Sequence, residues 1–160
     1  MSKQLIELYA DGAEKLSMAV RGLAAEDLTA KPSEPTAGKW SIQELLSHLA
    51  DSEGVFADRI KRVIAEENPQ LLAFDENRWA EHLAYSHRDS ADSLAMVAGV
   101  RKEITAILRH AGDSVWQRSG IHSAAGKMTL TQIVEKAIAH LDHHMEFVHA
   151  KRRAMGKEMW

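Results

Sequence analysis

The chain has 160 residues, which is enough for one domain with a buried core, and it contains no cysteine. Hydrophobic residues make up 45% and charged residues 27%, as in soluble globular proteins, and a net charge of -3 provides no basic face for nucleic acid. The lack of cysteine excludes disulfide scaffolds, thiolate metal sites and cysteine nucleophiles. No apolar run reaches the roughly 20 residues of a membrane span, and the N-terminus has no signal-peptide core. We therefore expect a single cytoplasmic domain over residues 1–160, without nucleic acid or membrane partners.

The first half of the chain predicts two helices. Apolar residues at three- and four-residue spacing predict a helix over about 3–24, followed by a connection that contains proline and glycine. The run Ser41-Ile42-Gln43-Glu44 is a capping box, in which the serine hydroxyl and the glutamate carboxylate accept hydrogen bonds from amides of the first turn. The second helix therefore begins here, and its apolar stripe continues to Ile64 before Pro69 closes it.

The second half predicts two more helices. Residues 68–88 form a long connection with one short helix inside it, and such a length in a compact domain is typical of a functional wall or lid. Asp89 is the expected N-cap of the third helix, which stops at Gly112. After a loop over 113–128, a second capping box at Thr129-Leu130-Thr131-Gln132 begins the fourth helix, which ends near 155. The pattern predicts an all-α four-helix bundle with a long connection between the second and third helices.

The stretch AHLDHHMEF, residues 139–147, places three histidines within five positions. His140 and His144 are four residues apart and share one helix face, whereas His143 and His149 point away from the apolar stripe. The spacing alone is weak because the chain has nine histidines. Two interpretations stay open: each inward imidazole hydrogen-bonds to a carboxylate across the bundle, or the two bind a metal ion.

A third ligand would have to come from another helix, and His48 lies at the border of the apolar stripe of the second helix. If the second and fourth helices run parallel in an up-down-up-down bundle, His48 lies about 10 Å along its helix, and His140 and His144 lie about 15 and 21 Å along theirs. These heights suit one shared site. Three histidines leave coordination positions open for water or substrate, as in catalytic rather than structural metal sites.

Three further residues are candidates to move protons or to position a substrate. Glu53 falls in the middle of an apolar stripe, so it either orients a ligating histidine, binds a substrate cation or, as we favour, pairs with an arginine such as Arg101. Asp51 is one turn from His48 and could accept a hydrogen bond from the far nitrogen of that imidazole. His122 precedes the fourth helix, where it either contacts substrate or is merely exposed.

Three stretches, GKWSIQELLSHLADSE (38–53), FDENRWA (74–80) and RSGIHSAAGKMTLTQIVEKAIAHLDHH (118–144), resemble in order and spacing the DinB/YfiT-like superfamily of bacterial four-helix-bundle metalloenzymes. In that family one histidine of the second helix and an H-x-x-x-H pair of the last helix bind a divalent metal. The resemblance therefore implies His48, His140 and His144 as ligands. It implies less about the reaction, since some members resemble bacillithiol- or mycothiol-dependent S-transferases, some resemble isomerases, and many have no assigned activity.

We expect a metal-dependent enzyme in which zinc or nickel activates a water or a thiol, as in a hydrolase or a thiol S-transferase. Imidazole ligands suit both metals, so the ligand set does not choose between them. The expected partner is a small-molecule substrate, such as a low-molecular-weight thiol. The main alternative is a non-catalytic, stress-associated metal-binding homodimer, for which the tryptophans offer aromatic surface: Trp40, Trp79, Trp116 and Trp160. A ligand-binding bundle without metal is a third interpretation.

Overall fold

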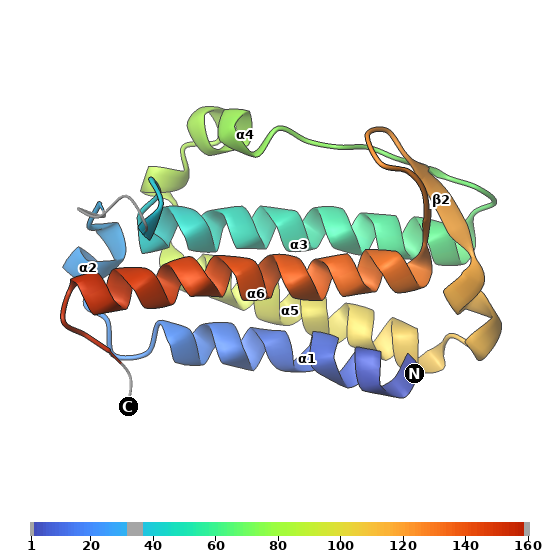
Figure 1. The fold of residues 1–160 in the computed structure, drawn as a ribbon, viewed down its shortest axis with the longest axis horizontal. Coiled ribbons are helices and arrows are strands. Elements are labelled where there is room, and N and C mark those ends of the chain that lie inside the picture. The colour runs from blue at the N-terminus through green and yellow to red at the C-terminus, as the bar shows by residue number, and fades with distance from the viewer. Residues whose placement is uncertain (1, 32–36, 159–160) are drawn as a thin grey trace.

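The computed structural model describes residues 2–31 and 37–158, and four long helices lie side by side in it (Figure 1). They are α1 (Ser2–Ala19), α3 (Ile42–Ala65), α5 (Ser90–His110) and α6 (Leu130–Ala154). Helices α1 and α3 each pack against both α5 and α6, so α1 and α3 are diagonal partners. The predicted all-α four-helix bundle is confirmed. No helix in the described part of the chain is both long and apolar enough to cross a membrane.

The helix directions differ from the up-down-up-down order. Helices α1 and α6 run one way and α3 and α5 run the other, because the connection after α3 returns along the whole bundle before α5 begins (Figure 1). The parallel arrangement expected for the second and fourth helices is therefore wrong, since α3 and α6 are antiparallel. His144 lies ten residues before the end of α6, about 15 Å. Because the histidines lie near the middle of α6, they are level with His48 whether α6 runs parallel or antiparallel to α3.

The predicted caps set where the bundle helices begin. The Ser41 amide donates to Glu44 Oε2 at 2.7 Å and the Glu44 amide donates to Ser41 Oγ at 3.2 Å, which completes the first capping box. Thr129 and Gln132 form the second box, and the Asp89 carboxylate accepts from two amides at the start of α5. These caps confirm the predicted starts of α3, α5 and α6. Helix α1 ends at Ala19, earlier than expected.

The connections contain more structure than expected. The long connection holds β1 (Gln70–Leu71), α4 (Glu76–His82) and the 3₁₀ turn η2 (Tyr85–His87). A further helix, α2 (Ala25–Thr29), follows α1, and the 3₁₀ turn η3 (Asp113–Gln117) follows α5. The predicted loop over 113–128 also forms β2 (Ser119–His122) and β3 (Gly126–Thr129), an antiparallel hairpin whose β2 pairs in parallel with β1. Strands of two to four residues are too short to show a periodic pattern, so the sequence did not predict them.

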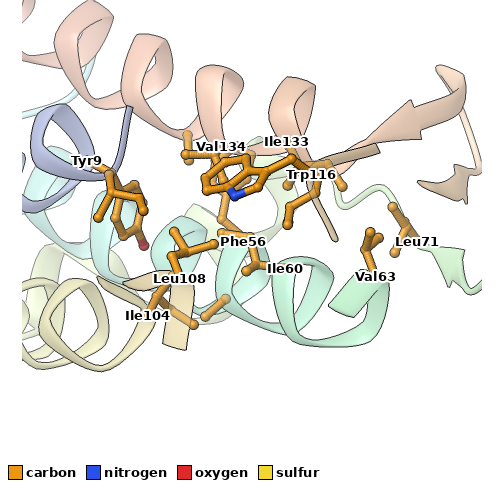
Figure 2. Close-up of a cluster of buried hydrophobic side chains, with 14 residues drawn as sticks. Tyr9, Phe56, Ile60, Val63, Leu71, Ile104, Leu108, Trp116, Ile133 and Val134 are labelled. Atoms are coloured by element: carbon orange, nitrogen blue, oxygen red, sulfur yellow. The ribbon is translucent and has the colours of Figure 1, made fainter. Parts of the chain in front are cut away.

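Two groups of buried apolar side chains fill the bundle. Figure 2 shows the first, in which side chains from all four long helices and the connections point toward one another, Phe56 and Val134 among them. Trp116 belongs to this core at 6% exposure, so the expectation that it offers surface for a partner is wrong. Trp40 and Trp79 are half-buried, and Trp160 lies outside the described residues. The second group surrounds Leu49 of α3.

Candidate metal centre

Three imidazole nitrogens from two antiparallel helices converge on one point. His48 Nε2 of α3 lies 3.2 Å from His140 Nε2 and 3.1 Å from His144 Nε2, both of α6. A neutral imidazole carries one proton, so His48 Nε2 cannot donate to both neighbours. A tetrahedral zinc ion with bonds of about 2.0–2.1 Å holds its ligand nitrogens about 3.3 Å apart. The observed spacing therefore fits nitrogens that share a metal ion.

The other nitrogen of each ring tests the alternative in which the imidazoles hydrogen-bond to carboxylates. The Nδ1 atoms of His48, His140 and His144 are buried and have no hydrogen-bond partner among residues 2–31 and 37–158. The alternative in which each imidazole hydrogen-bonds to a carboxylate across the bundle is thus not what the described residues form. Each Nδ1 atom therefore carries the cost of a buried polar group without a partner, and a metal ion at the Nε2 atoms would leave that cost in place.

The protonation state of the cluster suits a cation. Burial is the main cause, and the charge of neighbouring imidazoles a smaller one, of a pKa lowered to about 3 for each of His48, His140 and His144. The three rings are therefore neutral at pH 7. Neutral imidazole is the form that ligates a metal ion.

Glu76 joins the histidines from the long connection, and sequence reasoning missed it. Its Oε2 lies 3.6 Å from His48 Nε2, and its carboxylate together with the three imidazoles offers four ligand atoms within 4.8 Å of one another. Glu76 is in the first turn of α4, whose N-cap is Asp75, and its side chain is half-exposed. A residue in an aperiodic connection gives no helical-face signal. The one available signal was its place within the FDENRWA stretch.

Helix α4 belongs to the connection that returns along the bundle, and it lies beside α3 (Figure 1). Just before it, Phe74 places its ring centroid 6.3 Å from that of His48 and 4.6 Å from that of Trp79. The Trp40 ring stacks at 20° to the His144 ring, with centroids 6.5 Å apart. Aromatic side chains therefore pack against the histidines, while the polar Glu76 comes from the same connection as Phe74.

Glu53 makes the structural ion pair that the sequence analysis favoured. Arg101 Nη2 donates to Glu53 Oε1 at 2.5 Å, and the Tyr9 hydroxyl donates to Glu53 Oε2 at 3.1 Å. Arg101 also donates to the carbonyl oxygens of Tyr9 and Ala137, so the network joins all four long helices one turn before His140. Gly12 makes room for it, since a Cβ there would overlap Arg101 Nη1. Both oxygens of Glu53 are thus engaged away from the histidines.

The other two candidates for proton transfer also have partners elsewhere. Asp51 Oδ2 accepts from Arg88 Nη1 at 2.8 Å rather than from the far nitrogen of His48. His122 is buried at the end of β2, where its Nδ1 accepts from the amides of residues 124 and 125 and closes the hairpin turn; burial lowers its pKa. The structure brings neither residue into the group of ligand atoms around His48. Glu76, rather than Asp51 or His122, is the residue that joins the three histidines.

A cavity of about 250 Å³ opens beside the histidines. His144 and Glu76 line its inner end, and Trp40 and Phe147 form apolar walls. His143 also lines it, with a ring centroid 5.1 Å from that of Phe147, although its face of α6 was expected to point away. The candidate centre therefore combines buried histidines, His48 and His144, with access to a small pocket through His144 and Glu76, an arrangement suited to catalysis.

Known proteins are similar to this chain in sequence and in fold. The family model of the DinB superfamily matches residues 8–148. A protein of Oceanobacillus iheyensis is 27% identical over 143 residues, which cover 89% of this chain and 79% of that protein. YfiT of Bacillus subtilis is 29% identical over 120 residues, 74% of this chain and 67% of YfiT. Both carry the provisional name of metal-dependent hydrolase.

The solved structure of Bacillus subtilis YfiT is also similar to this fold. It superimposes with a TM-score of 0.87 over 97% of this chain and 87% of YfiT, at 27% sequence identity. That protein is described as having an unusual four-helix bundle topology. The return connection that makes α3 and α5 parallel is the feature of the present chain that departs from a simple up-and-down bundle.

Proposed function

This chain belongs to the DinB superfamily, and we propose that it is a metal-dependent hydrolase whose divalent ion is held by His48, His140 and His144. The observation that carries the proposal is the convergence of three Nε2 atoms that have no carboxylate partner apart from Glu76 among the described residues. The provisional names of the relatives point the same way. Zinc or nickel fits the ligand set, because imidazole suits both.

A divalent ion with three imidazole ligands keeps positions open and lowers the pKa of a water or thiol bound there. The residues around it have separate tasks. The three histidines would hold the ion as neutral donors, and the half-exposed Glu76, the carboxylate grouped with them among residues 2–31 and 37–158, would accept a proton from a water bound there. Phe74 and Trp40 exclude bulk water from the histidines, which strengthens electrostatic interactions inside.

Hydrolysis is the first version of the proposal, and thiol S-transfer is the second. The chain has no cysteine, so a thiol would have to arrive as a small-molecule cofactor. Water needs no such cofactor, and relatives of 27–29% identity are provisionally named hydrolases. The two versions share the histidine ligands and differ only in the nucleophile.

The proposal is tested on protein that has been stripped with a chelator and reloaded with zinc or nickel. Activated acyl esters such as p-nitrophenyl acetate probe hydrolysis, and a low-molecular-weight thiol with an electrophilic acceptor probes S-transfer. We expect ester hydrolysis that requires metal, is lost in His144→Ala and is kept in His149→Ala, an exposed histidine of the same helix. Turnover that needs the thiol would favour S-transfer over hydrolysis. Activity that is unaffected by metal removal would overturn both reactions.

A further inference from the structure

Lys151 is a buried cation without a counter-ion in the described part of the chain. It is 3% exposed in the last turns of α6, and its Nζ donates to the Ala37 carbonyl oxygen. Among residues 2–31 and 37–158 no carboxylate lies within ion-pair distance of it. The carboxylate of Glu44 favours its charge from a distance but is already bound by Lys31 and the Ser41 amide. Its partners among the described residues are neutral, the Ala37 carbonyl oxygen and the Phe147 ring, so an anion beside it would be favourable.

The Lys151 side chain lines the same cavity as the metal ligands. The cavity extends from Lys151 to His144 and Glu76. Gly38, at a φ of +72°, keeps the Lys151 end open, because a Cβ there would lie 3.3 Å from the Phe147 ring and 3.9 Å from Lys151 Nζ. Burial lowers the pKa of Lys151 to about 8, which leaves it mainly cationic at neutral pH. One small cavity thus has a cation at one end and the candidate metal centre at the other.

The Phe147 ring lies close to both ends of the cavity. Its ring centroid lies 6.1 Å from that of His144 and 5.7 Å from Lys151 Nζ. Phe147, Trp40 and Leu45 supply the apolar surface between the polar ends. At about 250 Å³ the cavity is slightly smaller than most ligand sites, so it suits a small molecule.

We propose that this cavity binds a small organic carboxylate with an apolar or aromatic body, with the carboxylate on Lys151 and the other end beside His144. A phosphate normally takes several donors, and Lys151 is the buried ammonium among the residues that line the cavity, since Lys39 is exposed and donates to Asn77 Oδ1 at 2.6 Å. One buried ammonium suits a monoanion. Carboxylate binding at Lys151 needs no metal. The inference rests on the proposed function only in taking the other end of the ligand, beside His144, as the group that reacts.

The test uses metal-free full-length protein, because a carboxylate would otherwise also ligate a bound ion. The probes are 3-phenylpropanoate and its uncharged amide, 3-phenylpropanamide, with affinities measured by calorimetry. Chemical shifts of the Gly38 amide and the Trp40 indole report whether the probe occupies this cavity. Lys151→Met removes the charge at similar length, and Lys102→Met, an exposed lysine of α5, is the matched control.

We expect wild-type protein and Lys102→Met to bind the acid at least about tenfold more tightly than the amide, as a charge-assisted hydrogen bond implies. Lys151→Met should bind both weakly and alike. Equal affinities for acid and amide in the wild-type protein, a measurement that needs no variant, would overturn the inference. An unchanged preference in Lys151→Met would also overturn it. Because no metal is present, either failure is distinct from a failure of the metal-dependent function.

Discussion

His144 Nε2 lies 3.1 Å from His48 Nε2, although 96 positions separate the two residues in the sequence and their helices run in opposite directions. Two independent caps produce this contact. The Ser41 box fixes where α3 begins, and the Thr129 box fixes where α6 begins, so each helix presents its histidine at a set height and face. Beside the histidines, the network of Arg101 and Glu53 holds the two helices together. The stability of that network and the chemistry of the site should therefore be separable by mutation.

Glu53→Gln should destabilise the protein strongly. The substitution removes the negative charge beside Arg101, whose side chain is 1% exposed, and leaves a buried cation uncompensated. Breaking a buried pair in this way costs about 3–5 kcal/mol, which urea denaturation monitored by circular dichroism can measure. Glu7→Gln, which breaks the exposed pair with Arg109, should change stability by no more than about 1 kcal/mol. Equal effects of the two substitutions would contradict the structural role given to Glu53.

Two substitutions of glycine by alanine within helices should change the stability of the protein in opposite directions. Gly12→Ala places a methyl group where it overlaps the Arg101 guanidinium, so it should cost about 1–3 kcal/mol despite the helix propensity of alanine. Gly99→Ala meets nothing within 4 Å in α5 and should stabilise the protein by about 0.5–1 kcal/mol. Thermal unfolding of the two variants checks both signs. A stabilising Gly12→Ala would show that Arg101 does not occupy the space beside α1.

The metal-free protein should lose stability as pH falls below about 6.5. Burial lowers the pKa of His48, His140 and His144 to about 3 in the folded chain, whereas the unfolded chain takes up these protons near pH 6.5. Their neutral folded form therefore contributes stability above pH 6.5 that is lost progressively between about pH 6.5 and 3. Urea denaturation of chelated protein at pH 7 and pH 5 measures the effect. The slope should be smaller in His144→Ala, and an equal slope in that variant would mean that other groups cause the acid sensitivity.

The sequence predicted best where a local interaction decides the structure. Serine, aspartate and threonine caps specify helix starts within a few residues, and a carboxylate in an apolar stripe requires a cation, which is why Arg101 could be named for Glu53. The direction of α5 was not predictable, because it depends on how far the connection over residues 66–89 travels and not on its composition. Glu76 was missed for the same reason: its place beside His48 is set by tertiary packing of an aperiodic segment.

X-ray absorption spectroscopy of zinc-loaded protein measures directly whether three histidines hold one divalent ion. The wild-type protein should take up about one zinc ion per chain, with about three imidazole nitrogens at about 2.0–2.1 Å. His143→Ala, which changes the neighbouring residue outside the ligand group, should give the same spectrum and uptake, and His144→Ala should lose one imidazole and bind zinc at least about 100-fold more weakly. No zinc uptake, a shell made only of oxygen ligands, or equal losses in the two variants would contradict the assignment of His48, His140 and His144.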